Sequence, residues 1–177
     1  MNELTNKFVS RFQRAVRIDT DFGDVSIVNS FVSSDTANKT IIEVCNHINN
    51  GQQAFTWTGA YGSGKSSLAV ILNGSLSHKN SEIYKKSLSL VSLEAQKAIN
   101  DTFPNSAKRM VLPIVAGREN LQLLIFNKLL KLYKSKKKYE TLFELIEDVS
   151  SSHKLLIVVD ELGKYLEFAN ANNEDIY

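Results

Sequence analysis

The chain has little of what would indicate an extracellular or a membrane protein. Of its 177 residues one is a cysteine, Cys45, so an internal disulfide is excluded. No apolar run approaches the roughly 20 residues that a helix needs to span a bilayer. The N-terminal residues 1–7 also lack the apolar core of a secretory signal. We therefore expect a cytoplasmic protein that has no membrane partner.

Histidine is scarce too, and the excess of positive charge is small. The three histidines have no spacing that would gather them with carboxylates or a thiol into a structural metal site. A formal net charge of +2 neither indicates nor excludes a nucleic-acid surface. Contents of 43% hydrophobic and 23% charged residues are ordinary for a globular protein. The length suits one domain with a hydrophobic core.

Residues 1–33 read as an N-terminal arm. Leu4, Phe8 and Phe12 recur every four residues and predict an amphipathic helix over 4–17. Basic residues lie beside this stripe, and we favour docking of the stripe on a core over a phosphate-binding role for the basic face. Residues 18–33 are expected to be irregular or to contain a short strand.

Residues 34–177 read as the core, in which helices alternate with strands. Such alternation is typical of an α/β fold with right-handed crossovers. Helices are predicted at 36–49, 66–73, 119–133 and 139–149, and strands at 53–58, 110–116 and 155–159. Residues 80–103 suit a helix, although 87–93 also alternate like a strand. Pro113 should face a sheet edge or a bulge, whereas the aliphatic run 155–159 predicts a central parallel strand covered on both faces.

The segment from Gly59 to Ser66 matches the pattern G-x-x-x-x-G-K-[ST] in full. Its glycines let the backbone approach phosphate oxygens, so that N–H groups converge on the anion at the start of a helix. Lys65 would reach the β- and γ-phosphates, and the Ser66 hydroxyl would ligate Mg²⁺. The expected ligand is a nucleoside triphosphate, ATP with Mg²⁺. The residues predicted to bind it are Gly59, Ala60, Tyr61, Gly62, Ser63, Gly64, Lys65, Ser66 and Ser67.

Two carboxylates follow the last aliphatic strand. Ligands of open α/β sheets lie at the carboxyl ends of strands, so Asp160 can hold Mg²⁺ there. Glu161, beside it, can polarise an attacking water. Together with the phosphate-binding segment upstream, these residues favour nucleotide hydrolysis.

These motifs resemble a known division of nucleotide-binding proteins. Residues 59–66 resemble a Walker A motif, and residues 155–161 resemble a Walker B motif of the form hhhhDE. The glutamate after the aspartate is typical of the additional-strand, catalytic-glutamate division of P-loop NTPases, which includes AAA+ and STAND ATPases. Residues 58–67 and 159–167 more narrowly resemble large bacterial AAA-like ATP-binding proteins, some of them tied to phage defence.

The resemblance implies both a fold and residue roles. The fold would be a P-loop three-layer sandwich with a mostly parallel sheet. Lys65 would be the catalytic, phosphate-binding lysine, Ser66 and Asp160 the Mg²⁺ ligands, and Glu161 the base for water. ATP binding and hydrolysis would be coupled to remodelling of a partner, so we expect a protein partner or self-association.

The resemblance also implies that the core is incomplete at its C-terminus. In that division a strand with a polar sensor residue follows the Walker B strand in sequence, and a neighbouring subunit often supplies an arginine finger. The residues after Glu161 contain no arginine, and 170–175 look like a turn. We therefore expect an N-terminal fragment of a larger ATPase that is inactive alone.

Two other functions remain open. A small-molecule kinase would have a natural length of this order, but usually carries its phosphate-binding loop near the N-terminus and arginines late in the chain. A nucleotide-binding or assembly module that hydrolyses nothing is compatible with the motifs, because the binding determinants are intact. A GTPase is disfavoured, since Asn127-Lys128 lies inside a helical pattern rather than after a strand.

Overall fold

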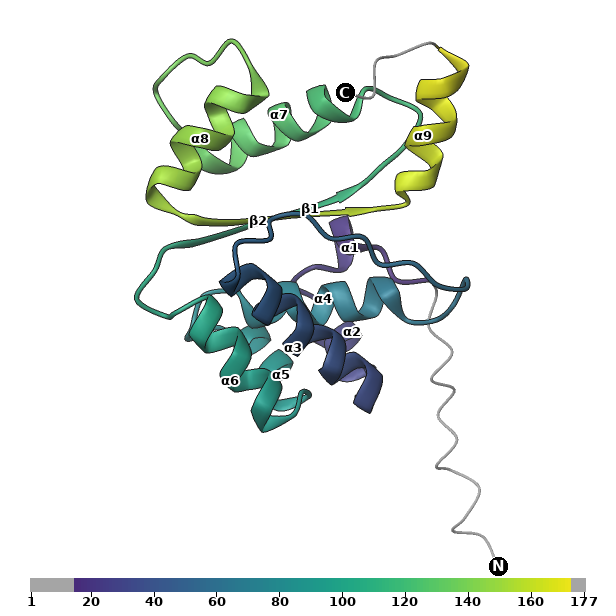
Figure 1. Cartoon of the computed structure of the whole chain (residues 1–177), viewed down its shortest axis with the longest axis vertical. Helices are drawn as coiled ribbons and strands as arrows, with labels where there is room; N and C mark the ends of the chain where they lie inside the picture. The colour runs from purple at the N-terminus through teal and green to yellow at the C-terminus, as the bar shows by residue number, and fades with distance from the viewer. Residues whose placement is uncertain (1–14, 173–177) are drawn as a thin grey trace, which may run out of the picture.

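The computed structural model describes residues 15–172, which form a mixed α/β fold. Two parallel strands, β1 (Arg109–Val115) and β2 (Lys154–Asp160), separate two groups of helices (Figure 1). One face of the strands carries α1 (Ile18–Asp21), α2 (Val25–Asn29), α3 (Asp35–Asn49), α4 (Lys65–Ser75), α5 (Glu82–Ser89) and α6 (Leu93–Thr102). The other face carries α7 (Leu121–Tyr133), α8 (Leu142–Ser152) and α9 (Leu162–Ala171).

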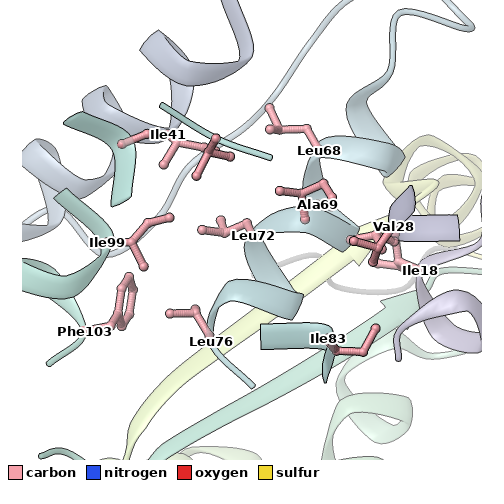
Figure 2. Close-up of a cluster of buried hydrophobic side chains, with 14 of the residues drawn as sticks. Ile18, Val28, Ile41, Leu68, Ala69, Leu72, Leu76, Ile83, Ile99 and Phe103 are labelled. Atoms are coloured by element: carbon pink, nitrogen blue, oxygen red, sulfur yellow. The ribbon is translucent and has the colours of Figure 1, made fainter. Parts of the chain in front are cut away.

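The first core lies between α4 and its neighbouring helices. Leu68 and Leu72 of α4, and Leu76 just after it, point toward Ile41 of α3 and the side chains at α6 (Figure 2). Ile18, Val28 and Ile83 lie on the other side of α4. Leu156 and Val158 of β2 pack against this cluster. Helix α4 is thus buried along most of its length, which fixes the position of its N-terminus.

The second core lies under α7 and α8. Leu112 and Ile114 of β1 pack there with Leu129, Leu145 and Val149, and Leu155 and Ile157 of β2 contribute from the same face. Strand β2 therefore contacts helices on both faces, as its aliphatic run predicts. It is not the central strand that was predicted, because the sheet of the described residues has two strands and β2 is one of its edges. All of the aliphatic residues of β2 remain half-buried.

The hydrogen-bond register explains the position of Pro113. The Lys154 N–H donates to the Lys108 carbonyl, and the Ala116 N–H donates to the Asp160 carbonyl, each at 2.8 Å. Successive residues of a strand direct their backbone N–H and C=O groups to opposite sides. The even-numbered residues of β1 therefore form hydrogen bonds with β2, and the backbone groups of the odd-numbered residues point away from β2. The backbone of Pro113, which has no N–H, therefore faces the outer edge of the sheet. The prediction that Pro113 faces a sheet edge or a bulge is confirmed.

Several predicted elements are confirmed. Helices α3, α4, α7 and α8 and strands β1 and β2 match their predicted ranges to within a few residues. Ser34 caps α3 by accepting a hydrogen bond from the Ala37 N–H at 3.1 Å, and Cys45 is fully buried on that helix. The ambiguous segment 80–103 is helical and is divided into α5 and α6.

The predicted strand at 53–58 is wrong. All of these residues lie in the described part of the chain, but they belong to no strand and make no backbone–backbone hydrogen bond with another described residue. A strand needs a partner, and the free edge of β2 does not pair with them. Trp57 still packs against the first core, together with Val158.

Three further predictions are wrong or lie partly outside the described residues. Residues 18–33 hold the short helices α1 and α2 rather than an irregular or strand segment. Helix α9 occupies 162–171, so the expected turn at 170–175 begins inside a helix, and 173–175 lie outside the described residues. The predicted arm helix at 4–17 falls mostly outside the described residues too, and 15–17 are not helical.

Within residues 15–172, no helix is both long and apolar enough to cross a membrane.

Candidate nucleotide site

The glycine-rich segment forms an exposed loop directly before α4. Gly62 and Gly64 have φ values of 77° and 86°, in the left-handed region that glycine adopts at least cost. Gly64 is the N-cap of α4, and its carbonyl accepts the first helical hydrogen bond, from the Leu68 N–H at 2.9 Å. The loop thus delivers its backbone to the N-terminus of a helix, where unpaired N–H groups favour an anion.

Lys65 is folded back onto this loop. Its Nζ donates to the carbonyls of Gly59 and Ala60 at 2.9 Å each, and to the Ser63 Oγ at 3.3 Å. Phosphate oxygens are charged and are stronger acceptors than these three oxygens, so a phosphate at this place would compete with them for the ammonium group.

Ser66 and Asp160 meet across the fold. The Ser66 Oγ donates to the Asp160 Oδ2 at 2.7 Å, a contact between residues 94 positions apart in the chain. It joins the first turn of α4 to the carboxyl end of β2. The two predicted Mg²⁺ ligands therefore lie close enough for one cation to contact both oxygens.

The Asp160 carboxylate is held at both oxygens. While Oδ2 accepts from Ser66, Oδ1 accepts from the Glu161 N–H at 2.9 Å. Glu161 itself has a left-handed backbone, with φ of 58° and ψ of 30°, and is the N-cap of α9. Such a conformation costs a non-glycine residue about 1 kcal/mol or more, and it recurs at functional sites.

The Glu161 side chain is exposed and directed along α9. Its Oε2 lies 3.3 Å from the Nζ of Lys164, one turn later in the helix. The pair is open to solvent and is worth little to stability. Lys164 was not identified from the sequence, although its spacing of three residues from Glu161 on a helix would have indicated the contact.

The other predicted binding residues lie around this centre. Gly59, Ala60, Tyr61 and Ser63 belong to the exposed loop, and Tyr61 is 92% exposed. Ser67 follows Ser66 in the first turn of α4 and is half-buried. The structure thus brings the predicted loop, Lys65, Ser66 and Asp160 together, with Glu161 at the rim.

The donor set fits Mg²⁺ better than a structural metal. In the described residues no group of three or more His, Cys, Asp or Glu could hold an ion. Mg²⁺ is commonly bound through one or two protein oxygens, with water and phosphate completing its shell. One hydroxyl and one carboxylate match that pattern.

Two shallow grooves lie away from these residues. One, of about 440 Å³, is lined by Lys137, Tyr139 and Asp148, and the other, of about 400 Å³, by Phe22, Pro113 and Lys131, among others. In the first, Asp148 accepts hydrogen bonds from Lys137, Tyr139 and Tyr133, and these bonds, that of Lys137 above all, lower the pKa of its carboxyl group. These contacts hold the loop after α7 in place.

Comparison of the chain with protein-family models, curated protein sequences and solved structures found no match.

Proposed function

We propose that this chain is the ATP-binding part of a Mg²⁺-dependent, AAA-like ATPase of the additional-strand, catalytic-glutamate division, with the layered P-loop fold of that division. The observation that carries the proposal is the 2.7 Å hydrogen bond between Ser66 and Asp160. Two motifs that were identified separately meet there at the carboxyl end of a parallel strand, where α/β proteins bind ligands. A chance glycine-rich loop would have no reason to lie beside that carboxylate.

Each residue has a distinct task in this function. The loop backbone and Lys65 bind the phosphates, and Ser66 and Asp160 hold Mg²⁺. When bound, Mg²⁺ neutralises charge on the β- and γ-phosphates. Glu161 accepts a proton from the water that attacks the terminal phosphate, after its carboxylate has left Lys164. Hydrolysis would then be coupled to rearrangement of a partner protein.

Calorimetry with ATP, with and without Mg²⁺, tests this proposal. The chain should bind ATP, and Mg²⁺ should tighten binding by at least about tenfold, since even one charge-assisted contact is worth about 1.5–3 kcal/mol. Asp160→Asn and Ser66→Ala should each lose most of that Mg²⁺ effect. Asp101→Asn, an exposed carboxylate on α6, is the matched control and should retain it. Absence of ATP binding at about 1 mM nucleotide with Mg²⁺ would end the proposal.

A nucleotide-binding module without hydrolysis is the second candidate. The contact between Glu161 and Lys164 favours it, because a base held by a cation is withheld from water. Measurement of turnover beside ATP affinity distinguishes the two functions. Tight Mg²⁺-dependent binding with no phosphate release would select the module.

A further inference from the structure

The loop between β1 and α7 leaves the sheet beside the candidate nucleotide site. Val115 is the last β1 residue in the ladder and lies opposite Asp160, and the Ala116 N–H donates to the Asp160 carbonyl at 2.8 Å. Ligands of parallel α/β sheets bind where neighbouring strands end. The loop therefore begins next to Asp160, at the carboxyl end of the strands.

Both ends of this loop are anchored. Ala116 is 2% exposed and packs against α9. The side chain of Asn120 caps α7 by accepting a hydrogen bond from the Leu123 N–H at 2.8 Å. Three residues lie between these anchors, and the middle one, Arg118, is exposed. A short loop fixed at both ends presents its central side chain in a restricted region.

Arg118 is a cation without a partner in the described part of the chain. Two other cations at this end of the sheet are engaged, Lys65 by loop carbonyls and Lys164 by Glu161. The Arg118 guanidinium makes no hydrogen bond or ion pair with residues 15–172. Among the described residues, the adjacent carboxylate of Glu119 forms no ion pair with it either. A guanidinium keeps its charge and binds phosphate with two parallel hydrogen bonds.

We propose that Arg118 contacts the terminal phosphate of ATP. This inference rests on the proposed function, because it needs the triphosphate to lie on the glycine-rich loop. The glycine-rich loop meets Asp160 through Ser66 of α4, whereas the loop that carries Arg118 starts from the end of β1. The part of the nucleotide that extends from the loop toward Glu161 is the terminal phosphate, which the attacking water meets. Arg118 therefore contacts ATP and not ADP.

The distances allow this contact. Adjacent strands are about 4.8 Å apart, and three extended residues span at most about 11 Å. The Cα of Arg118 thus lies within about 16 Å of the Asp160 Cα, a gap that the long arginine side chain and the triphosphate share. An arginine supplied by the same chain would stabilise charge on the transferred phosphate, as arginines do in other phosphoryl-transfer sites.

Parallel calorimetry with Mg²⁺-ADP and with a β,γ-imido analogue of ATP tests the contact. Arg118→Ala should weaken binding of the ATP analogue by about tenfold or more, while ADP affinity stays within about twofold of the wild type. Arg118→Lys should recover part of the loss, since lysine keeps the charge without the two-pronged geometry. Lys108→Ala removes an exposed cation at the opposite end of β1 and should change neither affinity.

Comparing the affinities for the two nucleotides tests the Arg118 contact separately from the proposed nucleotide-binding function. Binding of ADP by the wild type tests the nucleotide site, and the ratio of the two affinities tests Arg118. Equal weakening of both nucleotides by Arg118→Ala, or no effect on either, overturns the contact and leaves the nucleotide site standing. A wild-type chain that binds neither nucleotide overturns both. Retained ADP affinity in Arg118→Ala also shows that the variant is folded.

Discussion

Gly74 lies where α4 passes closest to α5, and replacing it with alanine tests the packing behind the candidate site. A Cβ on Gly74 would lie 2.1 Å from the Ser87 Oγ, 3.1 Å from the Ser87 Cβ and 3.2 Å from the Ile83 Cγ2. Ser87 is fully buried. Rotation of its hydroxyl relieves the shortest contact, but the other two remain too close. Gly74→Ala therefore requires Ser87 and Ile83 to give way by a few tenths of an ångström in the tight contact between α4 and α5.

The expected loss of stability follows from two opposing terms. Alanine is better than glycine in a helix by about 1 kcal/mol, whereas overpacking a buried site costs about 1–3 kcal/mol. With contacts this short we expect the upper part of that range, and hence a net loss of about 1–2 kcal/mol for Gly74→Ala. Gly163, in α9, has nothing within 4 Å of its Cβ position. Gly163→Ala should therefore stabilise the protein by up to about 1 kcal/mol.

Urea denaturation followed by far-ultraviolet circular dichroism measures both changes. Ser87→Ala removes the nearest atom, and that hydroxyl has no hydrogen-bond partner in its buried position. Ser87→Ala alone should therefore be close to neutral, and the Gly74→Ala, Ser87→Ala double variant should recover about half of the loss, a coupling that a double-mutant cycle detects. If Gly74→Ala stabilised the chain as much as Gly163→Ala, the close packing of α4 on α5 would be wrong.

Three further predictions concern the site and the sheet. Lys65→Ala should weaken Mg²⁺-ATP binding at least about tenfold, since it removes a charge-assisted contact worth about 1.5–3 kcal/mol, and equal calorimetric affinities of the two proteins would contradict this role. Glu161→Gln should leave nucleotide affinity nearly unchanged and abolish any ATP hydrolysis by this or a longer chain, because a base acts in the transition state; a parental rate would require another base. The chain alone should associate or be unstable, as measured by sedimentation and thermal melting, and should hydrolyse ATP negligibly. A monodisperse protein that melts cooperatively above about 45 °C and turns over ATP at about 1 s⁻¹ would refute this.

The sequence predicts elements whose structure is set locally. Helices α3 and α7 and strand β2 have clear apolar periodicity or an unbroken aliphatic run, and each lies close to its predicted range. Helices α1 and α2 contain four and five residues, too few to show a period. Helix α2 depends instead on a cap, in which Asp24 accepts a hydrogen bond from the Ser26 N–H at 2.8 Å.

The segment 53–58 fails for a different reason. Its aromatic and β-branched residues suit a strand, but a strand forms only where a partner supplies hydrogen bonds. No local pattern reveals whether that partner is present. Arg118 was missed on similar grounds, since the start of its loop next to Asp160 follows from the β1–β2 register and not from any motif. Ser66 and Asp160, by contrast, belong to recognisable patterns, and their proximity could be predicted from the two motifs together.

The two outer edges of the sheet differ in a way that bears on association. On β1 the residues whose backbone groups point to the outer edge include Pro113, which cannot donate a hydrogen bond to an added strand and so protects that edge. On β2 the residues whose backbone N–H and C=O groups point to the outer edge are Leu155, Ile157 and Val159, and none of them is proline or charged. All the aliphatic side chains of β2 are only half-buried, as expected where another strand could pack beside them. Strand pairing should therefore occur at β2. Because Asp160 ends that strand and bonds Ser66, a strand added at this edge would also act on the geometry of the nucleotide site.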